Sequence, residues 1–367
     1  MNRLPTEPGS PRTSRDTAAS CRARRLTWLD LFRGAAVLVM IETHVFNTFL
    51  DAGQRAQGWF GLLNYLNGLV APSFLFIAGF SSGWERRTSP GKPVNHARRA
   101  WRLGGIFALG YALHIPGPEL QQHRWADALR VGAQFDVLQC IAVSLGVLLA
   151  LSWLAGKLPR RRGEALWWIG AVAIAVLAVI GAPLVQSWTG GAVPFRALVN
   201  QTTGSLFPVF PWMGFVLLGA LAGAWPVRPV HERLATLIGL AGAAWMFRGT
   251  DFSAVSPAFF LERAVWVLGL AAVFEWSARF RQPSLLLFVG KNSLTLYFVH
   301  LVLISTLVGA GVTSMALPLP LTLGLLAAVA LASLAGTRLC GAAAAKWSAQ
   351  RVRRGEGART LSPASEA

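Results

Sequence analysis

The strongest constraint on the fold is a series of about ten long apolar runs separated by short polar segments. They lie near residues 27–50, 61–82, 102–115, 131–154, 165–184, 206–225, 234–247, 259–276, 284–308 and 320–342. A helix needs about 20 apolar residues to cross a bilayer, and only the third and seventh runs are clearly shorter. Charged residues make up 14% of the chain, against roughly 25% in a soluble domain. The sequence therefore predicts an all-α, polytopic integral membrane protein with about ten transmembrane helices.

The positive charge of the chain is distributed as a membrane topology requires. The net charge of +18 comes from 34 Lys and Arg residues against 16 Asp and Glu residues. If all ten runs span and the N-terminus is cytoplasmic, the outer segments hold only Arg55, Arg124, Arg130, Arg196 and Arg248. Nearly all other basic residues then fall on the inner side, as the positive-inside rule requires. We therefore predict cytoplasmic N- and C-termini, and the charge gives no support for nucleic-acid binding.

The two ends of the chain differ from its apolar middle. Residues 1–25 and 346–367 are basic and rich in small residues, with almost no apolar run. Such segments bury too little apolar surface to fold alone, so we expect a disordered basic cytoplasmic tail at 1–25 and a second basic tail at 346–367. Residues 26–345 form one transmembrane domain. The three cysteines are far apart in sequence, which predicts neither a disulfide framework nor a metal site.

Ionisable residues inside the first apolar run mark a candidate site, because each costs about 2.5–3.5 kcal/mol or more in lipid. Asp30, Arg33 and His44 fall on one face of a helix, with Asp30 and Arg33 at its cytoplasmic edge. His44 lies about 20 Å further along, near the outer boundary. Glu42 points to nearly the opposite side and needs a partner on another helix. The simpler alternative is an ion pair at the helix end and a hydrogen-bonded core histidine.

The ninth run carries a second group of polar residues. Ser293, Tyr297 and His300 are spaced so that they share one helix face. Lys291 and Asn292 precede them at the inner edge of the run. The group is a candidate for contacts with a substrate, and the alternative is that these side chains only form hydrogen bonds between helices.

Three further polar residues lie at the outer ends of the third and fourth runs. Asp136 and Gln139 are one helical turn apart at the start of the fourth run. His114 directly precedes the loop that contains Pro116, Gly117 and Pro118. We predict that all three face a substrate near the outer boundary, although a histidine at a loop end is also compatible with simple solvation.

Small residues in the second and sixth runs indicate close helix packing. Gly79 and Gly83 lie four residues apart, and so do Gly219 and Gly223. This spacing permits close contact between membrane helices. Prolines in the same runs leave backbone carbonyl groups free, which is tolerated where neighbouring groups or a cavity satisfy them. The pattern predicts packing around a cavity.

Three ordered sequence blocks resemble those of transmembrane acyltransferases. They are Leu29-Asp30-Leu31-Phe32-Arg33-Gly34 with Met40 and His44, the segment FPVFPWMG at 207–214, and NSLTLYFVH at 292–300. Over roughly residues 26–343 the chain is similar to the heparan-alpha-glucosaminide N-acetyltransferase catalytic-domain family and its bacterial relatives. This resemblance implies an enzyme of the bacterial cytoplasmic membrane. It would move an acetyl or other acyl group from cytoplasmic acyl-CoA to an extracytoplasmic acceptor, usually a sugar or glycan.

The resemblance also implies roles for the candidate residues. The lysosomal member of the family is credited with a histidine in the loop before the second helix, but residues 57–65 contain none here. The related broad acyltransferase family has its essential histidine at the position that matches His44. We therefore assign catalysis to His44 with Asp136 and His300. Binding of CoA is assigned to Asp30, Arg33 and Lys291, and contacts with the substrate to His114, Gln139, Asn292, Ser293 and Tyr297.

The resemblance leaves several alternatives open. Acyl-CoA is the expected donor substrate, and neither a permanently bound cofactor nor a metal is expected. Direct transfer and an acyl-histidine intermediate are both compatible with the sequence, and a homodimer is compatible with it as well. A proton-coupled transporter or lipid-linked sugar flippase would use the same intramembrane residues as a proton relay. The third alternative is a non-catalytic membrane scaffold.

Overall fold

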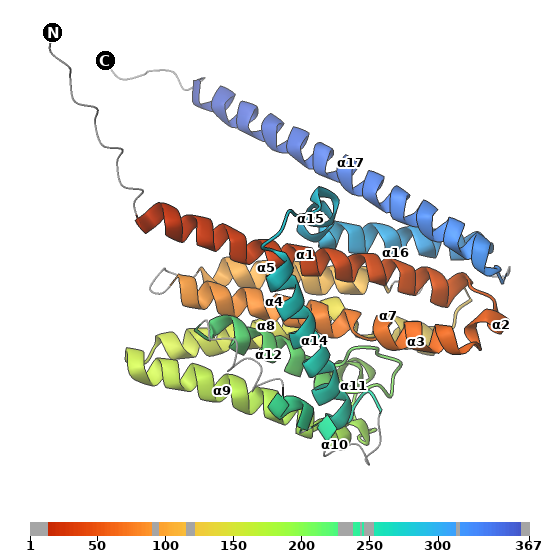
Figure 1. The fold of residues 1–367 in the computed structure, drawn as a ribbon, viewed down its shortest axis with the longest axis horizontal. Helices are drawn as coiled ribbons and strands as arrows, with labels where there is room; N and C mark the ends of the chain where they lie inside the picture. Colours follow the sequence, from red (N-terminus) through yellow and green to blue (C-terminus); the bar gives the residue numbers. More distant parts are fainter. Residues whose placement is uncertain are drawn as a thin grey trace, which may run out of the picture.

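The computed structural model describes residues 14–89, 95–114, 122–226, 238–242, 244–245, 253–312 and 316–360. Within these ranges the structure is helical, and β geometry occurs only as an isolated bridge between Leu50 and Leu317. The long helices are α1 (Ser14–Phe49), α4 (Val70–Thr88), α5 (His96–Ala112), α8 (Val137–Gly156), α9 (Arg160–Ile180), α12 (Val209–Ala224), α14 (Pro257–Ser277), α16 (Ser293–Gly309) and α17 (Leu319–Thr360). Shorter helices are α2 (Ala52–Arg55), α3 (Gly58–Asn67), α7 (Trp125–Gly132), α10 (Ala182–Gln186), α11 (Val193–Val199) and α15 (Ser284–Lys291). The all-α prediction is confirmed (Figure 1).

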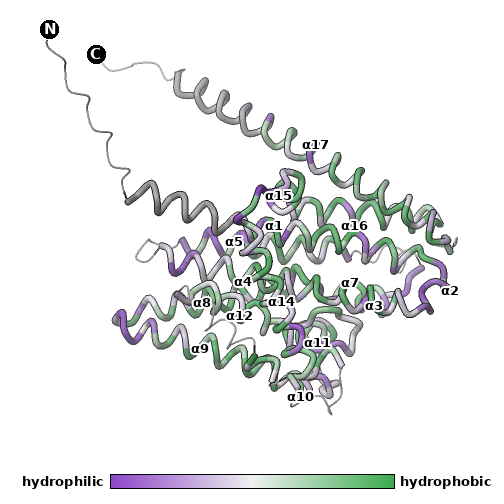
Figure 2. Tube along the Cα trace, in the orientation of Figure 1, coloured by the Kyte–Doolittle hydropathy of each residue, from purple (hydrophilic) through white to green (hydrophobic). Residues whose placement is uncertain are grey.

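Five helical segments in the described part of the chain are long and apolar enough to cross a membrane. They are Gly58–Thr88, Val137–Gly156, Arg160–Ile180, Pro257–Ser277 and Leu319–Trp347. The pair α15 and α16 qualifies only as a whole, and α12 is apolar but shorter. Hydrophobic residues dominate the middle of α9, α14 and α17, whereas hydrophilic ones gather at α2 and at the turn between α8 and α9 (Figure 2). The chain is therefore a multi-pass membrane protein.

The apolar runs correspond to helices with three differences from the expected pattern. The run at 284–308 is not one straight span, because α15 and α16 meet at a break with a bend of 82°. Half of the seventh run, at 234–247, lies outside the described residues, as do residues 1–13 and 361–367. The segments 14–25 and 346–360, expected as tails, are helical extensions of α1 and α17. Extending an existing helix needs no new nucleation, so polar residues can continue one that begins in an apolar span.

Glycines bring α4 and α12 into backbone contact, as the spacing of small residues predicted. A Cβ atom on Gly79 would lie 1.8 Å from the carbonyl oxygen of Val216, and one on Gly83 would lie 1.9 Å from that of Ala220. On the opposite helix, Gly219 meets the backbone of α4 in the same way. Because no side chain fits between the two backbones, van der Waals contact continues along the pair.

A second close contact holds α15 against α1. A Cβ atom on Gly290 would lie 1.8 Å from the carbonyl oxygen of Asp30, and one on Gly34 would lie 2.4 Å from that of Leu286. The residues that follow Gly290 are Lys291 and Asn292, where the chain turns into α16. The break between α15 and α16 therefore lies beside Asp30 of α1.

Candidate active site

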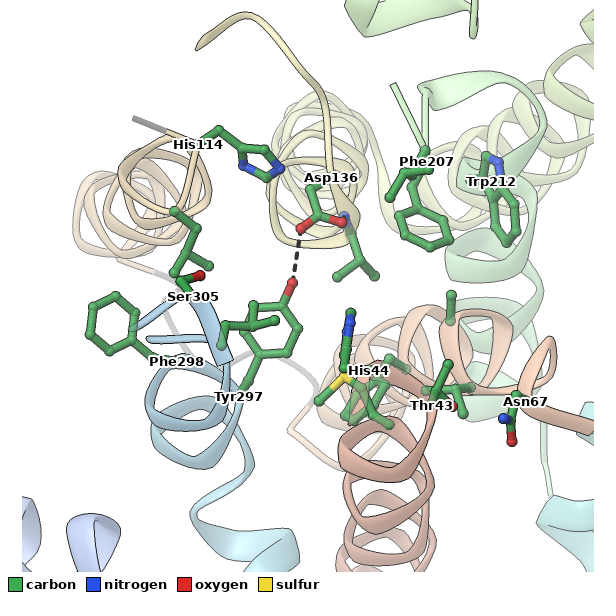
Figure 3. Close-up of a pocket in the computed structure, with 18 of the residues that line it drawn as sticks. Thr43, His44, Asn67, His114, Asp136, Phe207, Trp212, Tyr297, Phe298 and Ser305 are labelled. Atoms are coloured by element: carbon green, nitrogen blue, oxygen red, sulfur yellow. Dashed lines mark hydrogen bonds between the residues drawn. The ribbon is translucent and has the colours of Figure 1, made fainter. Parts of the chain in front are cut away.

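A cavity of about 700 Å³ lies where α1, α5 and α16 end and where α8, α12 and α14 begin. Such a volume is within the range of ligand pockets in general. Most of its lining is apolar, and the polar groups come from different helices (Figure 3). The predicted site residues that line it are His44, His114, Asp136 and Tyr297. Residues far apart in the sequence thus share one chamber.

His44 and His300 form the centre of the site. Their rings lie 5.4 Å apart between centroids, with a tilt of 44°. His300 is fully buried, and its Nδ1 atom lies 2.8 Å from the carbonyl oxygen of Leu296. A carbonyl only accepts, so Nδ1 carries the proton and donates it. In the neutral ring this leaves Nε2 as an acceptor, and Nε2 has no hydrogen-bond partner among the described residues. His44 faces the cavity, and His300 supports it from behind.

Asp136 is held by two helices at once. It caps the N-terminus of α8, where its Oδ1 atom accepts a hydrogen bond of 2.7 Å from the backbone N–H of Val137. Its Oδ2 atom accepts a hydrogen bond of 2.9 Å from the hydroxyl of Tyr297 on α16. The carboxylate also interacts electrostatically with His44. The structure therefore places a fixed negative charge where a protonated histidine would be stabilised.

Of Gln139 and His114, only His114 lines the cavity. Gln139 is fully buried and completes the capping box of α8, because its Oε1 atom accepts a hydrogen bond of 3.2 Å from the backbone N–H of Asp136. Gln139 is not among the residues that line the cavity, so its amide positions Asp136. His114 does line the cavity, with Nδ1 3.0 Å from the carbonyl oxygen of Gly110.

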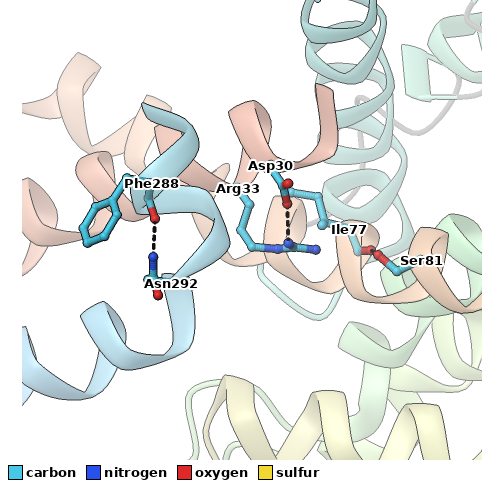
Figure 4. Close-up of polar contacts among 6 residues, drawn as sticks. All are labelled: Asp30, Arg33, Ile77, Ser81, Phe288 and Asn292. Atoms are coloured by element: carbon cyan, nitrogen blue, oxygen red, sulfur yellow. Dashed lines mark hydrogen bonds and ion pairs between the residues drawn. The ribbon is translucent and has the colours of Figure 1, made fainter. Parts of the chain in front are cut away.

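The second group of predicted residues lies at the other end of α1. Arg33 forms an ion pair with Asp30 at 3.1 Å, and both side chains are half-buried. Lys291 interacts electrostatically with Asp30. Figure 4 shows this ion pair and Asn292, whose Nδ2 atom donates a hydrogen bond of 2.8 Å to the carbonyl oxygen of Phe288. Ser293 starts α16 beside this group, away from the cavity.

The Asp30–Arg33 pair and His44 lie on the same helix, and the distance between them is about half the thickness of a bilayer core. His44 follows Arg33 by eleven positions along α1, which corresponds to about 17 Å at about 1.5 Å per residue. The expected polar face of α1 therefore exists. It turns toward α15 at Asp30 and toward α16 at His44, which is next to His300.

Comparison with known protein families identifies the chain. A family described as "Heparan-alpha-glucosaminide N-acetyltransferase, catalytic" matches residues 25–251. The chain belongs to this family. The comparison with curated protein sequences finds no match. Membership indicates membrane acetyltransferase activity, and it confirms the resemblance that the sequence blocks suggested.

The family match covers only one part of the candidate site. It includes the residues of α1, α5 and α8, among them His44 and Asp136. Tyr297, His300 and Lys291 lie beyond residue 251, so their connection with the heparan-alpha-glucosaminide N-acetyltransferase family rests on the geometry. Tyr297 is bonded to Asp136, and His300 packs on His44, which ties the unmatched part of the chain to the matched part.

Two cavity residues were missed in the sequence analysis. Asn67 and Trp212 both line the cavity and are 6% and 5% exposed. Asn67 lies close to Glu42, which is how the carboxyl group on the far side of α1 is accommodated. The signal for Trp212 was its place in the second family-like block, and that for Asn67 was a polar residue within an apolar run.

A polar cluster between α3 and α14 was also missed. Arg263 is 5% exposed, and its Nη1 atom donates a hydrogen bond of 2.7 Å to the carbonyl oxygen of Tyr65. Its guanidinium group lies 4.3 Å from the centre of the Tyr65 ring, and the Tyr65 hydroxyl bonds to Glu262. These contacts fix the end of α3 near Gly68, which lines the cavity. The cluster therefore shapes one wall of the site.

Proposed function

We propose that this protein transfers an acetyl or other acyl group from cytoplasmic acyl-CoA to an extracytoplasmic acceptor, a sugar or glycan. One observation carries the proposal. A single face of α1 presents basic and acidic groups at one end, and a histidine in a cavity at the other. An enzyme whose donor and acceptor bind on opposite sides of a membrane needs one binding site at each end of such a helix.

The proposal includes a topology of ten spans with both termini in the cytoplasm of a bacterium. The start of α1 and the end of α17 lie at the same end of the molecule, which supports an even number of crossings (Figure 1). Asp30, Arg33 and Lys291, which we call the Asp30 group, lie toward this end, and the cavity lies toward the other end of α1. The excess of Lys and Arg in the segments assigned to the inner side supports the same orientation.

In the donor site, Arg33 and Lys291 bind the phosphate groups of acyl-CoA. A guanidinium group and an ammonium group are the side chains best suited to phosphate. Asp30 holds Arg33 in place through their ion pair, and the contact of Gly290 with α1 holds Lys291 nearby. The unbranched pantetheine arm then extends along α1 and brings the thioester toward His44. CoA is a substrate here and leaves after each cycle.

In the acceptor site, His44 takes a proton from the hydroxyl or amino group of the acceptor as this group attacks the thioester carbonyl. A new C–O or C–N bond forms, the C–S bond breaks, and the proton passes from His44 to the CoA thiolate. Asp136 stabilises the positive charge on His44 between these steps, and Tyr297 keeps Asp136 in position. An acyl group held for a time on His44 fits the same geometry and has the same overall balance.

The test is mass spectrometry of surface glycans and lipids from a strain that lacks the gene and from the same strain carrying it. We expect one component to gain the mass of an acyl group only when the gene is present. Isotope-labelled acetate supplied to the cells should shift this increment if the group is acetyl. A transporter or flippase moves its substrate unchanged, so altered location without any added mass would contradict the proposal.

We expect Lys291→Gln to raise KM for acetyl-CoA about 10-fold, because one charge-assisted contact to phosphate is lost and such a contact contributes about 1.5 kcal/mol or more. The value of kcat should stay within about twofold, because Lys291 is far from His44. Steady-state kinetics of the purified protein at varied acetyl-CoA measure both constants. Arg279→Gln, a basic residue outside the Asp30 group, is the control. An unchanged KM would remove Lys291 from the donor site.

A further inference from the structure

The cavity is open on the side of α16 that faces away from the helix bundle. Phe298 and Val302 line the cavity, yet they are 37% and 43% exposed. Ser305 and Thr306, one turn further, are also both exposed and part of the lining. Residues that line a cavity and are also exposed mark the rim of an opening, which we call the lateral opening. Figure 3 labels two of these residues, Phe298 and Ser305.

The helices on the two sides of the lateral opening pack against different partners. On one side, α16 packs against α17 and α1. On the other side, α5 packs against α8, and its last residues, Ala112 to His114, reach the cavity. The pair α15 and α16 is apolar enough to span a membrane as a whole, and the rim residues Phe298 and Val302 are apolar and exposed. We therefore take the opening to face hydrocarbon.

The polarity of the cavity changes from the lateral opening inward. The rim presents Phe298 and Val302, and the hydroxyl of Thr306 is already bonded at 2.8 Å to the carbonyl oxygen of Val302. The inner wall presents His44 and the hydrogen-bonded pair of Asp136 and Tyr297. A ligand that matches both regions has a hydrocarbon chain at one end and a hydroxyl-bearing head group at the other.

We propose that the acceptor is a lipid-linked sugar or glycolipid, which enters from the bilayer through the lateral opening. Its sugar reaches His44, and its chain remains between α5 and α16. The inference rests on the proposed function, since it specifies the acceptor of the same site. The cavity volume of about 700 Å³ accommodates a sugar and the first part of a chain beside the acyl group.

Leu206, before α12, lines the same cavity and is exposed. A soluble sugar could therefore approach the cavity from this side instead. The experiment therefore compares acceptors that differ only in their chain. Purified protein in lipid nanodiscs is given acetyl-CoA and the methyl or decyl glycosides of glucose, glucosamine and N-acetylglucosamine. For the sugar that reacts, we expect kcat/KM to be at least about 10-fold higher with the decyl chain, because the chain buries apolar surface in the opening.

Partitioning of the decyl glycoside into the bilayer also raises its local concentration, so a variant must separate the two effects. Val302→Trp fills the rim, and we expect it to lower kcat/KM at least about 10-fold for the decyl glycoside but less than twofold for the methyl glycoside. Leu294→Trp is the matched control, since Leu294 is on the same helix, is equally exposed at 43% and is not part of the cavity lining. It should behave as the wild type.

A binding measurement keeps the acceptor proposal separate from the proposed function. Native mass spectrometry of the wild type should show saturable binding of a decyl glycoside, weakened by Val302→Trp and not by Leu294→Trp. Binding without any transfer would overturn the proposed function and leave the lateral opening in place. The lateral opening would be overturned if Val302→Trp lowered kcat/KM equally for the methyl and decyl glycosides. It would also be overturned if this variant kept the wild-type kcat/KM for the decyl glycoside. A shift of Val302→Trp from dimer to monomer would also overturn it, because a second copy would then cover this face.

Discussion

Replacing His44 with alanine should lower kcat for acyl transfer by about 10³-fold, because general acid–base catalysis contributes about 10² to 10⁴. The folded protein should remain in the membrane. His44 lines the cavity and is only half-buried, so its loss removes few packing contacts. The measurement is the rate at which CoA thiol appears in the presence of acceptor, with melting of the purified protein followed in parallel.

The matched control for His44 is His123→Ala. His123 is an exposed histidine before α7 and does not line the cavity, so its replacement should leave kcat within about twofold. Transfer at the wild-type rate by the His44 variant would remove this residue from catalysis. The search would then move to His114, which also lines the cavity, and to His300 behind it.

The second large effect is expected from Gly79→Leu, which should prevent the protein from folding. At this position α4 and α12 approach so closely that even a Cβ atom would lie 1.8 Å from the backbone of Val216. Overpacking that side chains can absorb costs about 1–3 kcal/mol, and here a backbone has to move. Because Gly83 and Gly219 continue the same contact, the helix pair would separate over several turns. Size-exclusion chromatography of the detergent-solubilised protein should show aggregate in place of a single peak.

Gly146→Ala on α8 is the control for this effect. No atom lies within 4 Å of a Cβ built on Gly146, so alanine adds no clash. Alanine is also favoured over glycine inside a helix by about 0.5–1 kcal/mol. This variant should therefore elute and melt like the wild type or slightly above it. A monodisperse Gly79→Leu protein with normal melting would contradict the close packing of α4 and α12.

Much of the fold was predictable from the apolar runs. A run of about 20 apolar residues in a chain with few charges has few alternatives to a membrane helix, and the helices lie where these runs were. The polar residues Lys291, Asn292 and Ser293 interrupt the run at this point, but the sequence did not show that they mark an 82° break between two helices. The contact of Gly290 with the backbone of Asp30 accompanies the break, and such a contact belongs to two helices.

The candidate site was predictable in its members but only partly in its arrangement. His44, Asp136 and Tyr297 were singled out because polar groups are costly in lipid, and they do meet at the cavity. Gln139 was expected to contact substrate, whereas its amide completes the cap of α8. The preference of a helix N-terminus for side-chain acceptors explains that difference. Trp212 is apolar by most measures, so only the tertiary structure shows that it lines the cavity.

Three features could be predicted from the sequence alone: the chain is a helical membrane protein, it belongs to an acyltransferase family, and polar groups mark both ends of α1. These features depend on local composition and on ordered motifs, which need no knowledge of neighbouring helices. The hydrogen bond between Tyr297 and Asp136, 161 residues apart, and the exposed cavity lining on α16 became visible only in the folded structure. Pairing between distant segments and the shape of a cavity depend on which helix faces meet, and packing in three dimensions sets those faces.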